Sequence, residues 1–380
     1  MTTTINNEHK KLNVPNLRFP EFQGEWEKSK LSDLCTFFSG GTPSSSNKDF
    51  YGGDIAFIRS GELHADSTEL FITQDGYDNS SAKKVEIGDL LLAMYGATSG
   101  DIAVSKIRGA INQAILCIRT NQNKKFIESV WHKHVSKILR KYLQGGQGNL
   151  SADIVKGISF SFPTLEEQEK IGQLMALLDE RIATQNKIIE DLKKLKSAIS
   201  LKMLHSDSWE QFKIQDIASI GRGRVISSVE ISQQENPLYP VYSSQTSNDG
   251  IMGYLDDFMF EGEYISWTTD GANAGTVFYR NGKFNCTNVC GLLKLKKGFD
   301  AHFVSLVLAE ATRMYVSTNL ANPKLMNNTM GNIQIRLPKL EEQKRISVVF
   351  RKLHGLLETH NSLIIKYSKQ KQYLLSQMFI

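Results

Sequence analysis

Two stretches of the chain carry apolar residues at the spacing of long helices. From Ile171 and from Ile346 onward, apolar positions recur every three and four residues, and each stretch contains two heptad rows. Two seams of period 3.5 in one chain predict a coiled-coil pair of helices. The rows are Ile171, Leu178, Gln185, Leu192, Ile199 with Met175, Ile182, Ile189, Lys196, Met203, and Ile346, Leu353, His360, Tyr367, Leu374 with Phe350, Leu357, Ile364, Lys371, Met378.

Polar residues interrupt both seams in the same rows. Gln185 corresponds to His360, and Lys196 corresponds to Lys371. In an antiparallel pair related by a pseudo-twofold axis, equivalent mid-helix positions meet. We therefore predict that Gln185 and His360 face one another and set the helix register, since buried polar seam residues can fix alignment. The alternative is that both side chains are exposed to solvent at an irregular edge of the helix contact. The two lysines are interpreted as reaching solvent near the helix ends.

The helical stretches belong to an internal repeat. Pro163-Thr-Leu-Glu-Glu-Gln returns as Pro338-Lys-Leu-Glu-Glu-Gln, and we call the sequence separation of these two prolines the repeat interval. Trp26-Glu27 matches Trp209-Glu210, and Asn149-Leu150 is paired with Asn319-Leu320. Proline before each helix is well placed, because its missing N–H costs little there. The alternative interpretation is an old duplication that was retained only for stability. We disfavour it because the two copies differ mainly in their globular middles, while the ends of the repeat match well.

The regions before the helices read mainly as short strands between turn signals. Glycine-rich turns punctuate residues 31–120 and 214–298, while residues 124–143 and 300–315 have helical patterns. We expect an α+β fold with two tandem α+β domains, each followed by a long helix. The predicted divisions are 1–163, a first helix at 164–205, a second domain at 206–338 and a second helix at 339–380.

Charge and composition limit the classes of function that the chain can have. The first globular region has 19 basic and 17 acidic side chains and the second has 11 and 13, so neither is strongly basic. If they bind nucleic acid, they do so through local patches, or a partner neutralises much of the phosphate charge. The polar start of the chain resembles no signal peptide and no apolar run reaches membrane-span length, so we expect a cytoplasmic protein with no membrane partner. Four sparse cysteines show no zinc-site spacing and are expected to be reduced core thiols.

No enzyme signature is found in the sequence. Asn236-Pro237-Leu238-Tyr239 only faintly resembles a methyltransferase tetrapeptide and is interpreted as a turn. The run from Gly221 to Arg224 is either a phosphate-binding loop or a flexible turn. Residues 145–149 form a polar, glycine-rich loop whose Gln and Asn side chains could read adenine edges, although a plain loop is the simpler reading.

The combination resembles the DNA specificity (S) subunit of type I restriction–modification systems over nearly the whole chain. The residues that carry the resemblance are Leu17-Arg18-Phe19-Pro20 with Trp26, Asn149-Leu150-Ser151, and the two proline–leucine–glutamate–glutamine segments at 163–168 and 338–343. The resemblance implies that each globular domain is a target recognition domain that reads one half of a split DNA sequence. It also implies that the helices pack antiparallel as a spacer and dock two methyltransferase subunits, and that restriction/translocase subunits join them.

The resemblance further implies a subunit without catalytic residues or metal, and with no cofactor of its own. S-adenosylmethionine, ATP and Mg are then expected on the partner subunits. A helix of about 40 residues is roughly 60 Å long, which exceeds one turn of duplex at about 34 Å and suits two half-sites with an unread gap.

Polar residues on glycine-containing loops at corresponding places are the candidate DNA contacts. Arginine and asparagine would read base edges, while serine and threonine would mostly hold phosphates. The candidates are Arg59, Ser60, Thr98, Ser99, Gln147, Asn149, Arg222, Arg224, Ser243, Gln245, Thr269, Asn273 and Asn319.

Two other classes of function stay open at this level. A coiled-coil scaffold for protein partners would have no DNA affinity in any assembly. A recognition module fused to a restriction–methylation enzyme would need a catalytic domain, which the sequence does not contain. The polar loop residues favour the DNA reader over the scaffold.

Overall fold

The computed structural model describes residues 12–142, 149–317 and 322–380. The chain divides into two compact units, and each combines one globular region with parts of both long helices. Unit 1 is Met1–Asn186 with Ser362–Ile380, and unit 2 is Lys187–Asn361. The long helices are α5 (Leu165–Met203) and α10 (Leu340–Met378), each of 39 residues. Each unit therefore depends on residues far apart in the sequence.

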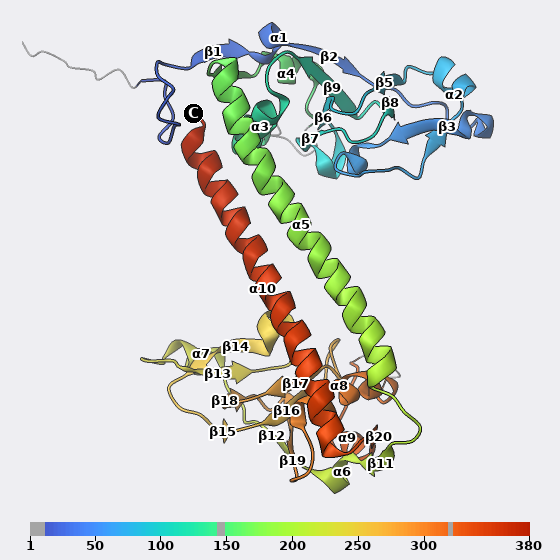
Figure 1. The fold of residues 1–380 in the computed structure, drawn as a ribbon, viewed down its shortest axis with the longest axis vertical. Coiled ribbons are helices and arrows are strands. Elements are labelled where there is room, and N and C mark those ends of the chain that lie inside the picture. Colours follow the sequence, from blue (N-terminus) through green and yellow to red (C-terminus); the bar gives the residue numbers. More distant parts are fainter. Residues whose placement is uncertain (1–11, 143–148, 318–321) are drawn as a thin grey trace, which may run out of the picture. The chain divides into compact units, whose positions relative to one another are not determined.

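Besides its parts of α5 and α10, the described part of unit 1 contains three small sheets and several shorter helices (Figure 1). One four-stranded sheet has the order β2-β9-β6-β7, the other has the order β4-β3-β8-β5 with β3 and β8 parallel, and β1 pairs with β10. The elements are β1 (Glu27–Lys30), α1 (Leu31–Leu34), β2 (Cys35–Ser39), η1 (Lys48–Phe50), β3 (Tyr51–Ile58), η2 (Ser60–Glu62), β4 (Phe71–Ile72), α2 (Gln74–Asp78), β5 (Lys83–Val85), β6 (Leu90–Ala93), η3 (Gly96–Thr98), β7 (Ile102–Val104), β8 (Gly109–Ile111), β9 (Ile115–Thr120), α3 (Lys124–Tyr142), α4 (Ala152–Gly157) and β10 (Ser159–Phe162).

Unit 2 repeats this topology strand for strand. Its sheets have the orders β12-β19-β16-β17 and β14-β13-β18-β15, with β13 and β18 parallel, and β11 pairs with β20. The elements are β11 (Glu210–Lys213), α6 (Ile214–Ile217), β12 (Ala218–Arg222), α7 (Ser228–Ser232), β13 (Tyr239–Tyr242), η4 (Ser247–Gly250), β14 (Ile251–Leu255), β15 (Phe260–Glu261), β16 (Tyr264–Thr268), β17 (Val277–Arg280), β18 (Lys283–Cys286), β19 (Cys290–Leu295), α8 (Ala301–Ala311), η5 (Thr312–Met314), α9 (Asn327–Asn332) and β20 (Gln334–Leu337).

The expected α+β class, the tandem repeat and the two long helices are confirmed. The central strands are buried because their residues are almost all apolar, as in β6, where every residue is buried. The expected helices at 124–143 and 300–315 correspond to α3 and to α8 with η5. The identical strand orders extend the duplication into the middles, where the two sequences match poorly.

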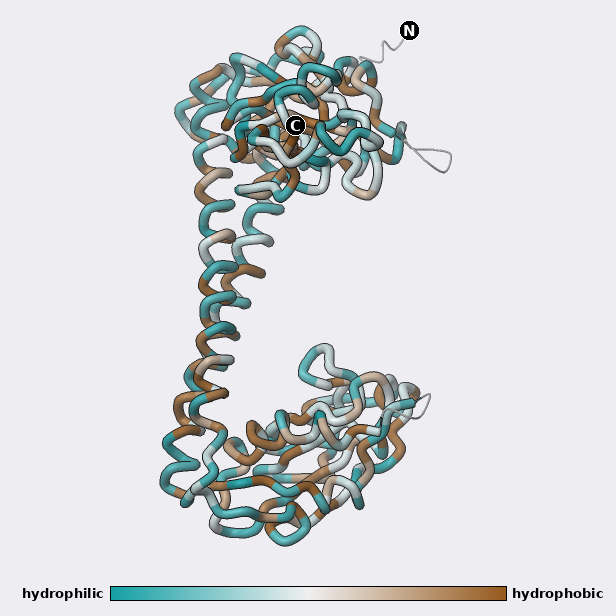
Figure 2. Tube along the Cα trace, turned by 90° about the vertical axis from the view of Figure 1, so that its right-hand side faces the viewer, coloured by the Kyte–Doolittle hydropathy of each residue, from teal (hydrophilic) through white to brown (hydrophobic). Residues whose placement is uncertain are grey.

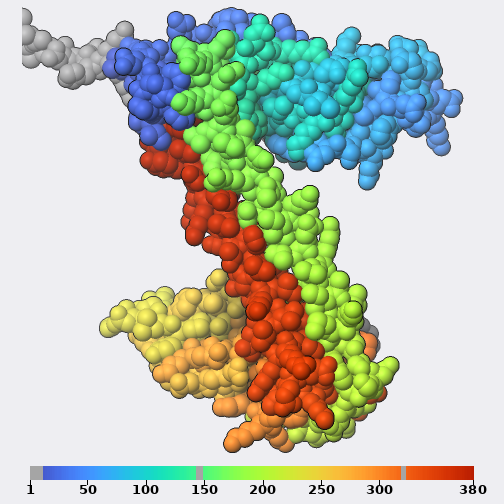
Figure 3. Space-filling view, viewed as in Figure 1, coloured from blue at the N-terminus to red at the C-terminus, as the bar shows by residue number. Residues whose placement is uncertain are grey.

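The ends of the long helices complete the cores of the units. In unit 1 the ring of Phe379 lies 5.2 Å from that of Phe126, which also packs edge-on against Trp26 at 5.6 Å. Figure 3 shows the last residues of α10 against the start of the described chain, residues 12–25, which we call the N-terminal arm. In unit 2 the buried Leu204 follows α5 into a core that contains Phe303. Leu204 and Phe379, which are separated by the repeat interval, thus occupy the same place in the two units.

The helix pair is antiparallel where both helices run through unit 1. Lys371 bonds to Asp179, and the Arg181 guanidinium lies 5.7 Å from the ring centre of Tyr367, so rising numbers in α5 meet falling numbers in α10. Apolar and polar residues alternate along both helices (Figure 2). The interpretation of Lys371 as a solvent-reaching lysine is wrong, because it forms an ion pair with Asp179 and is only 21% exposed. The pairing of Gln185 with His360 stays a prediction.

Candidate nucleic-acid interface

Backbone hydrogen bonds join separate turns of unit 1 into one group. Gly41 donates to Ile111 at 3.2 Å, and Asn112 donates to Ile58 at 3.2 Å. The chain of bonds continues from Met94 to the Ala114 carbonyl at 2.8 Å and from Leu150 to the Met94 carbonyl at 2.9 Å. We call this group the unit 1 loop set, and it comprises residues 40–43, 58–60, 94–100, 111–114 and 149–151.

Unit 2 contains the same network of bonds. Arg224 donates to Cys286 at 3.2 Å and Thr287 donates to Tyr242 at 2.9 Å. Thr269 donates to Val289 at 3.2 Å, and Leu325 donates to the Thr269 carbonyl at 2.8 Å. The unit 2 loop set comprises residues 223–226, 242–250, 269–275, 286–289 and 324–326. The two sets share a backbone framework and differ in most of their side chains.

A glycine at the same place in each set allows the close approach of two strands. A Cβ atom on Gly40 would lie 1.8 Å from the Ile111 carbonyl oxygen, and one on Gly223 would lie 1.6 Å from the Cys286 carbonyl oxygen. No side chain fits at such distances, so both positions require glycine. The glycine-rich turn after β12 therefore has a packing role, whatever else it contacts.

The structure brings most of the residues predicted in the first domain together. The Met94 carbonyl accepts both the Ser99 hydroxyl at 3.0 Å and the Leu150 amide, which places the turn containing Thr98 beside Asn149. Arg59 precedes η2 and Ser60 is its first residue, directly after the strand whose Ile58 joins the same network. Gln147 lies outside the described residues.

Two ion pairs, at Arg59 and at His64, affect the positive charge in and beside the unit 1 loop set. The Arg59 guanidinium bonds to Glu62, with Nη2 and Oε1 2.8 Å apart, so its charge is partly neutralised within η2. His64 Nε2 lies 3.0 Å from the Asp101 carboxylate and joins the segment after η2 to the turn before β7. The hydrogen bond to Asp101 raises the pKa of His64, which therefore carries more positive charge near neutral pH than a free histidine.

The residues predicted in the second domain are also gathered, with different partners. Arg222 donates to the Asn327 side chain at 2.9 Å, and Arg224 forms an ion pair with Glu230. Ser243 follows β13 as Arg59 follows β3, and the Gln245 amide bonds to the Ile251 carbonyl. Asn273 is exposed on the turn between β16 and β17.

Thr269 is placed differently from the other candidates. It is only 2% exposed, and its hydroxyl donates to the Val289 carbonyl at 3.0 Å. Thr269 thus holds the turn that contains residues 286–289. Its side chain presents no surface to a ligand in this conformation.

The pairing of Asn149-Leu150 with Asn319-Leu320 is corrected by the backbone bonds. Leu150 donates to Met94 and Leu325 donates to Thr269, so Leu325 occupies the place of Leu150 and Lys324 that of Asn149. This restores the repeat interval found in the helices. Asn319 itself lies outside the described residues.

Two exposed amide side chains were missed by the sequence reasoning. Gln113 and Asn288 are both exposed, at the tips of the turns that follow β8 and β18. They are separated by the repeat interval, and the Thr42 hydroxyl donates to the side-chain amide oxygen of Gln113. The repeat interval, applied to the turns as well as to the helices, could have found them.

A buried arginine supports the loop that begins at Ser243. The Arg280 side chain is 1% exposed, and its guanidinium carbon lies 3.6 Å from the Tyr242 ring centre. It bonds to Asp249 at 2.7 Å and to the Ser266 hydroxyl at 3.0 Å. Asp249 and Asn248 have positive φ angles of 53° and 51°, an uncommon conformation for residues other than glycine. Arg280 therefore positions this loop from behind.

Comparison with known proteins decides the family. The model of the type I restriction modification DNA specificity domain matches twice, at residues 23–194 and 206–366. The chain belongs to this type I specificity family. A putative type I specificity subunit of Mycoplasma pneumoniae is 36% identical over 230 residues, which cover 58% of this chain and 95% of the relative. The specificity subunit of the type I restriction enzyme MpnII from the same organism is 41% identical over 177 residues, 45% of this chain and 53% of the relative.

Solved structures of type I specificity subunits share the fold. The crystal structure of the S subunit from M. genitalium has a TM-score of 0.73 at 15% identity and covers 97% of this chain and 99% of its own. The predicted family resemblance is confirmed. Within the described residues, no helix is long and apolar enough to cross a membrane, and no His, Cys, Asp and Glu group is arranged to hold a metal ion.

Proposed function

We propose that the chain is the sequence-reading subunit of a type I restriction–modification complex, in which each loop set reads one half of a bipartite double-stranded DNA target. One observation carries this proposal. Two loop sets with the same backbone hydrogen bonds present exposed polar side chains at equivalent positions, including the amides of Gln113 and Asn288. A shared framework with different side chains suits two related readers of different half-sites.

The exposed amides are the strongest candidates for base reading. A Gln or Asn side chain can donate to the N7 acceptor of adenine and accept from its N6 amino group as a bidentate pair. We assign this role to Gln113 with Asn149 in unit 1 and to Asn288 with Asn273 in unit 2. Thr98, Ser60 and Ser243 are assigned to phosphate contacts, which position a protein without reading sequence.

The arginines have a different proposed role. Arg59 and Arg224 already pair with Glu62 and Glu230 in their own loops. A DNA contact by either guanidinium requires exchange of that carboxylate for a phosphate or a base edge. We therefore propose that they hold their loops in the free subunit and turn to DNA only in the complex, together with Arg222.

The long helices are proposed to dock the partner subunits. Apolar side chains such as Leu177, Val348, Leu356 and Ile365 are exposed on their surfaces, with exposed fractions from 47% to 56%. Such residues on helices suit further helical partners. We propose two methyltransferase subunits, joined by restriction/translocase subunits, which would carry S-adenosylmethionine, ATP and Mg. Because the globular regions are nearly neutral, these partners would supply many of the positively charged contacts to the DNA phosphates.

The deciding experiment is genome-wide adenine methylation in cells that contain the methyltransferase partner, with this gene present or deleted. Loss of one split motif on deletion is the expected result, and it would give both half-sites and the gap. An unchanged methylome, with the partner expressed and active, would favour the scaffold function instead.

A further inference from the structure

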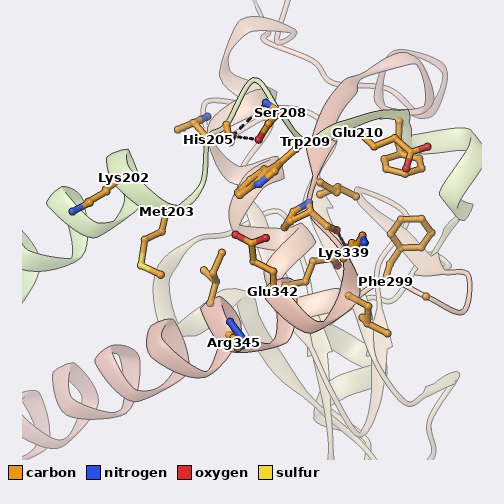
Figure 4. Close-up of a pocket in the computed structure, with 18 residues that line it drawn as sticks. Lys202, Met203, His205, Ser208, Trp209, Glu210, Phe299, Lys339, Glu342 and Arg345 are labelled. Atoms are coloured by element: carbon orange, nitrogen blue, oxygen red, sulfur yellow. Dashed lines mark hydrogen bonds between the residues drawn. The ribbon is translucent and has the colours of Figure 1, made fainter.

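Unit 2 contains an open groove that no part of the described chain fills (Figure 4). Its volume is about 950 Å³, and its walls come from the end of α5, the start of β11 and the start of α10. Lys202 and Met203 form one side, Trp209 lies across from them, and Glu342 and Arg345 project from α10. The groove therefore combines aromatic, acidic and basic groups.

The corresponding place in unit 1 is occupied by the N-terminal arm, residues 12–25. Arg18 binds the Glu167 carboxylate in a bidentate manner, from Nε at 2.8 Å and from Nη2 at 2.7 Å. The rings of Phe19 and Phe22 lie 5.1 Å and 5.9 Å from the Lys170 ammonium. The Leu17 amide donates to the α10 backbone at Gln377 at 3.0 Å. Ionic, aromatic and backbone contacts thus hold the arm.

The residues that hold the arm have direct equivalents in the empty groove. Glu167 corresponds to Glu342 and Lys170 corresponds to Arg345, each pair being separated by the repeat interval. Gln377 corresponds in the same way to Lys202. All three equivalents line the groove. The groove therefore repeats the arm's binding site, with a carboxylate and a cation in the same places.

The occupant is missing because the repeat has no second arm. Unit 1 reaches β1 through residues 12–26, whereas unit 2 reaches β11 from the end of α5 at Met203 through the short connection 204–209, part of which lines the groove. The difference is visible at the carboxylates. The Glu167 side chain is 1% exposed beneath Arg18, while Glu342 is exposed and has no hydrogen bond or ion pair from its side chain within the described part of the chain.

We propose that the unit 2 groove is a docking site for an arginine–phenylalanine segment of a partner protein. Its arginine would pair with Glu342 as Arg18 pairs with Glu167, since a bidentate arginine–carboxylate contact is strong and directional. Its aromatic ring would lie against the Arg345 guanidinium, as Phe19 lies against Lys170. A second copy of this chain is a poorer donor, because giving up its arm would leave its own buried Glu167 carboxylate unpaired.

A peptide with the sequence of residues 12–25, labelled with a fluorophore, is the probe. Binding to the full chain is measured by anisotropy, and a photoreactive phenylalanine at the position of Phe19 maps the site. Glu342→Gln is expected to weaken binding at least about tenfold, and so is Arg18→Ala in the peptide, because either change removes the charged pair. Glu341→Gln is the matched control, since Glu341 is exposed on the same turn but does not line the groove.

Cross-links to the segments that contain Trp209 or Glu342 support the proposal. Absence of binding, an undiminished affinity of the Glu342→Gln chain, or cross-links near Glu167 would each overturn it. A concentration-dependent dimer that Glu342→Gln abolishes would assign the groove to the arm of a second copy and so overturn the choice of partner. None of these results depends on DNA, so the DNA-reading proposal is tested separately.

Discussion

The side-chain amides of Gln168 and Gln343, separated by the repeat interval, make the same pair of hydrogen bonds in the two units. Each donates to the proline carbonyl before its own helix, Gln168 to Pro163 at 2.9 Å and Gln343 to Pro338 at 2.8 Å. Each also accepts a backbone N–H just before the domain helix, from Asn123 at 3.2 Å and from Asp300 at 2.9 Å. Both glutamines are 1% exposed. The repeated Glu-Glu-Gln segment therefore fastens each long helix to the globular part of its unit.

Replacing either glutamine should destabilise the unit that contains it. Gln168→Ala leaves the Asn123 N–H and the Pro163 carbonyl without partners, and the loss of such buried bonds costs about 1–3 kcal/mol. Gln343→Ala should do the same in unit 2. Hydrogen exchange measured by mass spectrometry should show faster exchange in the affected unit only. Glu341→Gln is a suitable exposed control, and equal effects on both units from one substitution would contradict this account.

Residues at and just after the end of α10 should contribute strongly to the stability of unit 1, although they lie at the end of the sequence. Phe379 is 2% exposed and packs on Phe126. Phe379→Ala should destabilise unit 1 by about 3–5 kcal/mol, the range for truncating a buried phenylalanine. Leu204→Ala is the matched change in unit 2, and its expected cost is about 2–5 kcal/mol.

Denaturant unfolding followed by unit-resolved hydrogen exchange checks both substitutions. Leu201→Ala serves as the control, because Leu201 is 77% exposed and its truncation should change the free energy of unfolding by less than about 0.5 kcal/mol. If Phe379→Ala left the exchange of the strands in unit 1 unchanged, the role of Phe379 in that core would have to be withdrawn.

The two amide turns should affect different halves of the DNA target. If Gln113 and Asn288 each read a base, alanine at either position should relax one base pair of one half-site, at about 1–3 kcal/mol of lost discrimination. Methylation sequencing in cells with the methyltransferase partner measures both changes. Asn281→Ala is the control, because Asn281 lies at the opposite end of β18 from Asn288. Relaxation of the same half-site by both substitutions would rule out one half-site for each unit.

Unit 2 should lose stability in mild acid through His302. Burial, followed by the nearby Arg351 charge, lowers the pKa of His302 to about 4. Its Nδ1 lies 2.9 Å from the Ser347 hydroxyl and its ring 5.2 Å from that of Tyr279. An unfolded histidine binds its proton near pH 6.5, so between about 6.5 and about 4 the unfolded state binds more protons than the folded state. The stabilisation is therefore complete above about pH 6.5 and declines as the pH falls through this window.

Urea unfolding at about pH 7.5 and about pH 5 measures this decline. His302→Gln should flatten the pH dependence of unit 2. His64→Gln, at a histidine of unit 1, should leave the pH dependence of unit 2 as in the unchanged chain. A slope that survived His302→Gln would show that other groups cause the acid sensitivity.

The sequence by itself determined the elements that depend on local spacing. The heptad rows predicted both long helices, and the proline–Glu-Glu-Gln segments located their starts, because helix period and helix ends are set by neighbouring residues. The internal repeat predicted two domains of one fold. The apolar run Ile87–Met94 predicted a buried strand, since burial on both faces needs apolar residues in succession, and β6 (Leu90–Ala93) lies within that run.

Only the tertiary structure decided which distant residues meet. Leu325 rather than Leu320 takes the place of Leu150, because the equivalence rests on a backbone hydrogen bond across the fold and not on side-chain identity. Thr269 is buried, with its hydroxyl bonded to the Val289 carbonyl, and Gln113 is exposed, although both are polar residues in turns. Phe379, almost at the end of the sequence, completes the core of unit 1 by packing on the distant Phe126. Glu342 faces an empty groove, whereas the equivalent Glu167 binds Arg18. Such contacts depend on the three-dimensional path of the chain. Patterns of neighbouring residues in the sequence do not predict that path.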